Sequence, residues 1–348
     1  MTLDHIKKLS PYNPPTEGRT SFEGTRLDFN ERSVDPKFLK SVFDELLINN
    51  QVHIYPEYGE LEAAIAGYCS VKPEQIMLSA GSDQGIETIF RTYTQKGDKV
   101  IIPEPTFSMF AQNARVAGSR LFSPSYASDM AYPTNEVLDL IDDDTRLVVI
   151  VTPNNPTGTS VSLEDITSIA KKAANAAVIV DEAYFEFSGV TATGLVQACP
   201  NLIILRTFSK AFGLAGLRVG YAVADRENIE QMKKVRSPYG VNAVAVAAAK
   251  KALEQPEDMQ DYVSHVNDVA RPYLENFFDN ARIKYYKSDA NLILFQVKDS
   301  QSIYEKLKEA GILTRPQNKP EIKNTIRVTV TDAEEMKEFA SAYKRLFL

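Results

Sequence analysis

The chain has 348 residues, of which 44% are hydrophobic and 24% charged, and its net charge is −7. This length and composition predict a globular protein with one large domain and one smaller domain. The sequence contains no run of eighteen apolar residues, and its charges are scattered, so we expect neither a membrane span nor a nucleic-acid binder.

The N-terminal sequence and the cysteines bear on location. MTLDHIKKLSPYNPP lacks the apolar core of a signal peptide, so we expect no export. Cys69 and Cys199 form no C-x-x-C pair and have no histidine near them in the sequence, which argues against a disulfide framework or a metal site. These features predict a cytoplasmic protein.

The first part of the chain predicts an extended, proline-rich arm, followed by helices from Asp35 and after Gly59. Strands and helices then alternate. The predicted strands are 76–80, 99–105, 146–153, 177–184, 202–209 and 218–225, and the predicted helices between them include 85–93, 109–118 and 163–174. This order predicts an α/β fold with a mostly parallel sheet, and apolar runs such as VVIV and LIIL predict helices on both of its faces.

The last third of the chain predicts a smaller α+β unit. A long helical stretch, 228–280, is followed by strands at 291–297 and 325–331, with a helix between them and another from Ala333. We therefore divide the chain into an N-terminal arm with part of the small domain (1–45), a large domain (46–245) and a small C-terminal domain (246–348). We expect the arm to pack with the small domain.

Polar residues follow several of the predicted strands. Ligands in open α/β sheets bind beyond the carboxyl ends of the strands. Gly81, Ser82 and Asp83 open a helix, whose free N–H groups favour a phosphate, although an ordinary helix N-cap explains them equally well. Asp181 ends a buried strand, where a carboxylate needs a cation or several donors, although it could equally cap the next turn.

Lys210 is the most informative of these residues. Alone, it would be read as a solvated lysine with a buried stem. At a strand end, with Arg218 eight residues on, its amine can be partly desolvated and act as a nucleophile toward an aldehyde. An amine, a carboxylate, polar groups for a phenolic oxygen and donors for a phosphate together describe a site for pyridoxal phosphate.

The chain resembles the fold-type I, pyridoxal-phosphate-dependent aminotransferases of class I/II, and within them the histidinol-phosphate aminotransferases. The resemblance covers nearly the whole length. Its motifs are LSPYNPP, YPEYGELEAAIAGY, SAGSDQGIETIFRTY, PEPTFSMFAQNARVAG, TPNNPTG, VDEAYFEF, LRTFSKAFGLAGLRVGY, SPYGVN and GILTRPQNKPEIKNTIRVTVT.

The resemblance implies a role for each matching residue. Lys210 would bind the cofactor covalently and act as general base and acid. The expected cofactor contacts are Asp181 with the ring nitrogen, Asn155 and Tyr184 with the phenolic oxygen, Phe107 on the ring face, and Ser82, Asp83, Ser209 and Arg218 with the phosphate. Tyr55 would reach that phosphate from the neighbouring subunit, which implies a homodimer.

The resemblance also implies the substrates. Arg327 would bind the anion of the substrate, and Tyr12, Arg315 and Asn155 are expected beside it. The implied reaction converts L-histidinol phosphate and 2-oxoglutarate to imidazole acetol phosphate and L-glutamate, in histidine biosynthesis. The alternatives are an aromatic amino acid aminotransferase, a decarboxylase of a phosphorylated hydroxy amino acid, and a binding module without activity. The last is disfavoured by the complete set of catalytic positions.

One motif departs from the family. A run similar to N-E-N-P is usual after the first strand, but here the chain reads Asn30-Glu31-Arg32-Ser33. This segment is expected to border the substrate pocket. The departure leaves the cofactor residues unchanged and concerns the contacts to the imidazole side of the substrate.

Overall fold

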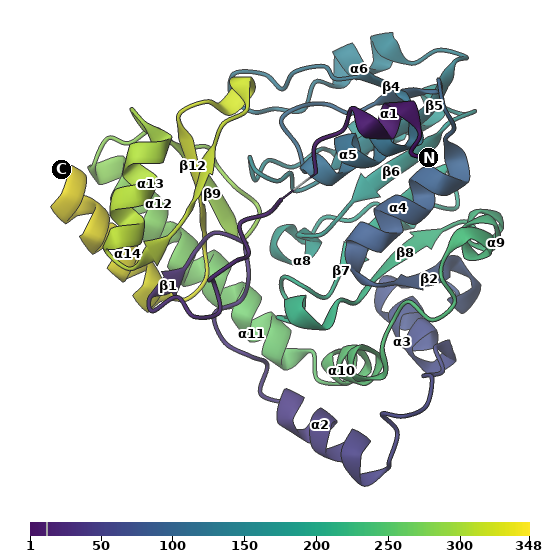
Figure 1. Cartoon of the computed structure of the whole chain (residues 1–348), viewed down its shortest axis with the longest axis horizontal. Coiled ribbons are helices and arrows are strands. Elements are labelled where there is room, and N and C mark those ends of the chain that lie inside the picture. The colour runs from purple at the N-terminus through teal and green to yellow at the C-terminus, as the bar shows by residue number, and fades with distance from the viewer. Residues whose placement is uncertain (12) are drawn as a thin grey trace.

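The computed structural model describes residues 1–11 and 13–348 of the chain. Among these described residues, the larger sheet has seven strands (Figure 1). In order across the sheet they are β2 (Ile76–Ser79), β8 (Gly220–Ala224), β7 (Leu202–Thr207), β6 (Ala177–Asp181), β5 (Thr145–Val151), β3 (Lys99–Ile101) and β4 (Arg120–Phe122). Neighbouring strands are parallel, except that β8 is antiparallel to β2 and β7. The mostly parallel sheet predicted from the sequence is confirmed.

Both faces of this sheet are buried. In β5, Leu147 and Val149 belong to one apolar cluster, whereas Val148 and Ile150 belong to the other. Successive side chains of a strand point to opposite faces, so the two clusters are the two sides of the sheet. The helices in the same part of the molecule as this sheet are α3 (Gly59–Cys69), α4 (Gly81–Tyr93), α5 (Ser108–Ala117), α6 (Thr134–Leu140), α7 (Leu163–Lys172), α8 (Phe185–Ser188), α9 (Arg226–Val235) and α10 (Ala243–Glu254).

The second part of the molecule is built on a smaller antiparallel sheet. Its strands, in the order β11 (Arg315–Gln317), β12 (Thr325–Thr329) and β9 (Leu292–Gln296), pack with α12 (Arg271–Asn280), α13 (Ser300–Glu309) and α14 (Ala333–Phe347) (Figure 1). α11 (Glu257–His265) continues into α12 through a π-helical segment, Val266–Ala270. A short strand near the N-terminus, β1 (Thr25–Arg26), pairs in parallel with β10 (Ile312–Leu313).

Polar N-caps determine where several helices begin. Each capping side chain accepts a hydrogen bond from a backbone N–H of the first turn, which satisfies a donor that the helix itself leaves unpaired. These caps are Ser162 for α7, Asp225 for α9, Asn242 for α10, Asp299 for α13 and Asp332 for α14.

The structure departs from the prediction in the N-terminal arm. An extended arm was predicted, but residues 4–7 form a helical turn, α1 (Asp4–Lys7), that packs on α5. His5 Nε2 lies 3.1 Å from the Val116 carbonyl oxygen. Through α1, the arm contacts α5 in the larger part of the molecule. Through β1, it contacts β10 in the smaller part. The domain limits at 45 and 245 stay a prediction.

Other elements escaped prediction because they are short. They are β4 and α6. The helix predicted from Asp35 is present as α2 (Leu39–Ile48), which starts four residues later. Over residues 1–11 and 13–348, no helix has both the length and the apolar character to span a bilayer.

Candidate active site

A cavity of about 1390 Å³ lies where the parallel strands end, between the larger sheet and the β11–β12 pair. Most of the predicted site residues line it: Ser82, Asp83, Phe107, Asn155, Asp181, Tyr184, Ser209, Lys210, Arg218, Arg315 and Arg327. Tyr12 lies outside the described residues. Tyr55 is not among the described residues that line this cavity.

Lys210 follows β7, and its amine lies inside the cavity. Lys210 Nζ donates a hydrogen bond of 2.7 Å to the Phe29 carbonyl oxygen. The pKa of Lys210 is lowered from 10.5 to about 8. Burial is the largest cause, and the nearby Arg327 guanidinium acts in the same direction. The amine is therefore much closer to its neutral, nucleophilic form at physiological pH than a surface lysine is.

Asp181 is the last residue of β6 and is only 3% exposed. Burial raises its pKa to about 7, against the effect of the Ala183 N–H, which donates to Asp181 Oδ1 over 3.1 Å. A buried carboxylate of this kind is stabilised in its charged form by a cationic group beside it.

The start of α4 forms an anion cradle together with Arg218 and Ser209. Gly81 has φ 72°, and a Cβ there would lie 2.4 Å from Arg218 Nη2, so only glycine allows this close approach. Arg218 also forms a 2.8 Å ion pair with Asp83. The Ser209 hydroxyl, which accepts from Thr207 Oγ1 over 2.9 Å, is buried at the same end of the sheet. The helix N-terminus and the guanidinium together favour a phosphate.

Asn155 and Arg327 join the two parts of the molecule across the cavity. Arg327 Nη1 donates to Asn155 Oδ1 over 2.7 Å, and Arg327 Nη2 donates to the Asp28 carbonyl oxygen. In the smaller sheet, Arg315 on β11 is the register partner of Arg327 on β12. The two arginines are thus placed side by side by strand pairing.

Phe107 and Tyr184 bring aromatic rings to the same cavity. Phe107 is the N-cap residue of α5, and its ring packs edge-on against Phe110, with centroids 6.3 Å apart. Tyr184 is buried after β6, and its ring centroid lies 6.0 Å from Lys210 Nζ.

The segment Asp28–Glu31 contacts three of the predicted residues. It overlaps the run Asn30–Ser33, which was predicted to border the substrate pocket, only at Asn30 and Glu31. Its Asp28 and Phe29 carbonyl oxygens accept from Arg327 and Lys210. Asn30 Nδ2 donates to Tyr184 Oη over 2.8 Å. The segment follows β1, and it is β1 pairing with β10 that brings it to the cavity.

Arg19 is a cavity residue that the sequence analysis missed. Its guanidinium bonds to Asp28 at 2.8 and 3.0 Å and to Glu31, and its Cζ lies 4.1 Å from the Phe29 ring centroid. Although burial opposes it, hydrogen bonds to Glu31 and Asp28 raise the pKa of Arg19. Arg19 therefore forms ion pairs with the first and the last residue of the Asp28–Glu31 segment.

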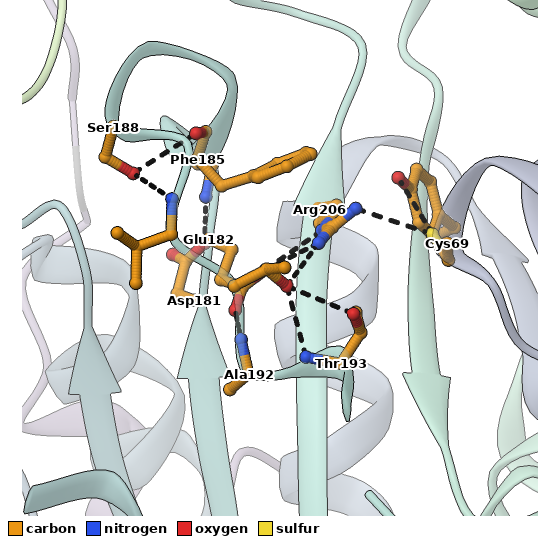
Figure 2. Close-up of polar contacts among 12 residues, drawn as sticks. Cys69, Asp181, Glu182, Phe185, Ser188, Ala192, Thr193 and Arg206 are labelled. Atoms are coloured by element: carbon orange, nitrogen blue, oxygen red, sulfur yellow. Dashed lines mark hydrogen bonds and ion pairs between the residues drawn. The ribbon is translucent and has the colours of Figure 1, made fainter. Parts of the chain in front are cut away.

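A buried ion pair lies directly behind Asp181. Glu182 turns to the other side of the chain and faces Arg206 on β7 (Figure 2), at 2.9 Å. The Ala192 N–H donates to Glu182 Oε1, and the Thr191 hydroxyl donates to Oε2. Both charged side chains are almost fully buried, so the turn after β6 is fixed by a satisfied polar network. Arg206 had no sequence signal beyond its place inside an apolar strand.

A family comparison agrees with this geometry. The profile described as "Aminotransferase class I and II" matches residues 23–342. The chain belongs to the class I and II aminotransferases. A relative of this aminotransferase, named histidinol-phosphate aminotransferase, from Thermoanaerobacter sp. (strain X514), is 34% identical over 328 residues, which are 93% of each chain.

Solved structures share the fold of this aminotransferase. A histidinol-phosphate aminotransferase from Sinorhizobium meliloti, in complex with pyridoxal-5'-phosphate, superposes with a TM-score of 0.89 at 22% identity, over 99% of this chain and 96% of that one. An L-threonine-O-3-phosphate decarboxylase from Porphyromonas gingivalis superposes with a TM-score of 0.80 at 21% identity, over 92% and 98%. At these identities the likeness shows the fold alone.

The residues that line the cavity fit the cofactor that the family resemblance implies. The Gly81–Arg218–Ser209 cradle suits a phosphate, and the buried Asp181 carboxylate suits a protonated ring nitrogen. The lowered pKa of Lys210 suits a nucleophilic amine.

Proposed function

We propose that this aminotransferase uses pyridoxal 5'-phosphate to interconvert L-histidinol phosphate and 2-oxoglutarate with imidazole acetol phosphate and L-glutamate, in histidine biosynthesis. The observation that carries the proposal is the match, over 93% of both chains, to a relative named for this activity. The cavity supports it, because it brings the predicted cofactor and substrate residues together.

The cofactor residues have the following proposed roles. Lys210 would hold the cofactor covalently, Asp181 would pair with its ring nitrogen, and Phe107 would stack on the ring. Asn155 and Tyr184 would bond the phenolic oxygen, and Ser82, Asp83, Ser209 and Arg218 would bind the phosphate. When bound, the cofactor supplies an electron sink next to the substrate Cα.

Lys210 would also move the proton. Once its amine is free, Lys210 Nζ would remove the proton from the substrate Cα as a general base and later return it as a general acid. A pKa of about 8 suits both directions, because the neutral and charged amines are then both populated near physiological pH. The Phe29 carbonyl oxygen offers the charged amine an acceptor inside the cavity.

Arg327 would bind the anionic group of each substrate. Its hydrogen bond to Asn155 fixes the direction of the guanidinium and links substrate binding to a residue of the proposed cofactor site. Arg315 and Tyr12 would lie beside the phosphate of the substrate L-histidinol phosphate. Arg315 Cζ lies 5.7 Å from the Phe29 ring centroid. A guanidinium can bind a carboxylate or a phosphate through two parallel hydrogen bonds.

Half-reactions test the substrate assignment. Purified protein loaded with pyridoxal phosphate is mixed in turn with L-histidinol phosphate, L-phenylalanine and O-phospho-L-threonine, and absorbance and CO₂ are followed. We expect L-histidinol phosphate to convert the cofactor to pyridoxamine phosphate and 2-oxoglutarate to restore it. Faster conversion by phenylalanine would assign an aromatic aminotransferase, and CO₂ release from O-phosphothreonine would assign a decarboxylase. Lys210→Ala is the inactive control.

The proposal includes a homodimer in which Tyr55 reaches the cofactor phosphate of the neighbouring subunit. Tyr55 is 75% exposed and stacks near Tyr239, with ring centroids 4.5 Å apart. Before it in the chain, α2 and the segment that follows leave large apolar side chains exposed: Phe43, Leu47, Ile48, Val52 and Ile54. Several large apolar side chains exposed within one short stretch of chain are typical of a protein interface.

A cytoplasmic location is part of the same proposal. Cys69 and Cys199 are buried and free, which is compatible with a reducing compartment.

A further inference from the structure

We propose that Asn30 is a positioning residue that turns the Tyr184 hydroxyl proton toward the phenolic oxygen of the cofactor. This inference rests on the proposed function, in which Tyr184 bonds that oxygen. It concerns a residue that reaches the cofactor only through another side chain.

The hydrogen bond between the two side chains has a defined direction. Asn30 Nδ2 donates to Tyr184 Oη over 2.8 Å, and the two residues are 1% and 3% exposed. A tyrosine hydroxyl has one proton to donate. Because its oxygen accepts from Asn30, that proton is free to point into the cavity that Tyr184 lines.

The orientation of the Asn30 amide is set by its other contacts. The Thr329 hydroxyl donates to Asn30 Oδ1 over 3.4 Å and accepts from the Asn30 N–H over 3.0 Å. Asn291 Nδ2 donates to the Asn30 carbonyl oxygen over 3.2 Å. With Oδ1 facing Thr329 on β12, the amide nitrogen is left facing Tyr184.

The backbone explains why asparagine stands at this position. Asn30 has φ 55°, in the left-handed region, where asparagine is several-fold enriched among non-glycine residues. A longer amide or a hydroxyl residue would meet more strain there. The position therefore combines a left-handed backbone with a short side-chain amide that can donate a hydrogen bond.

Burial keeps the Tyr184 hydroxyl protonated. Burial raises the pKa of Tyr184 above its usual value, and the Asp181 carboxylate raises it as well, while the Arg327 guanidinium and the hydrogen bond from Asn30 lower it. Lys210 also faces the ring, at 6.0 Å. A hydroxyl that is protonated and already accepting a bond is a stronger donor, because hydrogen bonds in a chain polarise one another.

The test uses the full-length holoprotein and the pH at which its visible absorbance changes. A donor directed at the phenolic oxygen stabilises the deprotonated form of the bound cofactor. It therefore lowers the pH midpoint of the absorbance change. Asn30→Gly keeps the left-handed backbone and both backbone hydrogen bonds but removes the amide. We expect it to raise the midpoint by about 0.5 pH unit and to weaken cofactor binding to the apoprotein.

A double-mutant cycle separates this role from general loosening. Tyr184→Phe should raise the midpoint more than Asn30→Gly does, and adding Asn30→Gly to Tyr184→Phe should give no further shift. Ser33→Ala, three residues away and bonded to Thr331, is the matched control and should leave the midpoint unchanged. Thermal unfolding of each variant reports whether it folds.

Each outcome decides the inference. Equal midpoints in wild type and Asn30→Gly, or an equal shift in the Tyr184→Phe background, would overturn it. If Asn30→Gly does not fold, Asn30→Asp decides on the same cycle, since it keeps the shape and cannot donate when charged. Failure of the wild type to bind pyridoxal phosphate at Lys210 would overturn the proposed function instead.

Discussion

Two titratable residues of the site, Lys210 and Asp181, have pKa values that burial shifts toward neutrality. Burial moves Lys210 down to a pKa of about 8 and Asp181 up to about 7, so each group is held close to its neutral form. Groups of this kind, gathered in one cavity, are typical of catalytic sites. Binding a cationic ring nitrogen beside Asp181 would restore its charge and lower its pKa again.

The first prediction concerns the rate at which the apoprotein captures pyridoxal phosphate. Because the neutral amine is the nucleophile, the rate should rise with pH by about tenfold per unit below the Lys210 pKa and level off above about pH 8. Stopped-flow absorbance between pH 6 and 10 measures it, because this range covers both the rise below the Lys210 pKa and the plateau above it.

Variants of the cavity arginines refine this prediction. Arg327→Gln removes a positive charge that disfavours the protonated Lys210 amine. It should therefore raise the pH at which the capture rate levels off. Arg315→Gln removes a guanidinium from the same cavity and serves as the matched control. A rate that still climbs at pH 10 in the wild type would contradict the lowered pKa.

At the scale of elements, the ends of β6 and β7 are fixed by the pair between Glu182 and Arg206. Asp181 faces the cavity, and the next residue, Glu182, faces the buried guanidinium (Figure 2). Arg206 Cζ also lies 3.5 Å from the Phe185 ring centroid. The pair therefore determines the direction in which the chain leaves β6, and with it the position of Asp181.

The second prediction is that Arg206→Ala lowers the free energy of unfolding by about 3–5 kcal/mol, because it leaves the Glu182 carboxylate buried without its cation. Chemical denaturation measures it. Lys40→Ala, which removes an exposed ion pair with Asp44 on α2, should cost less than about 0.5 kcal/mol. Equal costs for the two variants would show that the buried pair does not hold these strand ends.

The Asp28–Glu31 segment is the second element that the site depends on. Its carbonyl oxygens and Asn30 contact three residues of the site, and Arg19 holds its two acidic residues. These residues lie in a loop after β1, whose own position depends on pairing with β10.

The third prediction is that Arg19→Met, which keeps apolar contact with Phe29 but removes the charge, weakens pyridoxal phosphate binding several-fold. It leaves Asp28 and Glu31 without their cation, so the segment should lose its fixed position. Equilibrium titration of the apoprotein measures the affinity. Arg226→Met breaks an exposed pair with Glu230 and should leave binding as in the wild type. Unchanged affinity in Arg19→Met would mean that the segment is held by its backbone contacts alone.

At the scale of the whole molecule, the cavity is built by both sheets. The larger sheet supplies the residues after β2, β5, β6 and β7, and the smaller sheet supplies Arg315 and Arg327. Tyr55 is exposed and is not among the described residues that line this cavity, so its side chain is available to a second copy of the chain.

The fourth prediction is that two inactive chains complement one another. Lys210→Ala keeps Tyr55, and Tyr55→Ala keeps Lys210, so a mixed dimer contains one site with both residues if Tyr55 acts across the interface. Co-refolded mixtures should recover up to about a quarter of wild-type activity per subunit, because half of the dimers are mixed and each has one complete site of two. Sedimentation velocity should show dimers for both single variants. Activity no higher than the sum of the separate variants would place Tyr55 outside the neighbouring site.

The larger sheet and most of the site residues at its edge could be predicted from the sequence alone. Consecutive apolar residues predict strands covered on both faces, and the residues that follow such strands must meet at one end of a parallel sheet. Asp181, Lys210 and the start of α4 could be predicted because each is adjacent in sequence to the strand that places it. The short elements α1, β4 and α6 were missed because a few residues carry little periodicity.

The residues that hold the site residues in position could not be predicted, because they are distant in the sequence and meet only in the folded chain. Asn30 and Tyr184 are 154 positions apart, and Phe29 and Lys210 are 181 positions apart. Arg206 and Glu182 become partners because β6 and β7 are neighbours in the sheet. Such contacts depend on the order of the strands in space and on the left-handed turn at Asn30, and neither has a period or spacing that a single sequence displays.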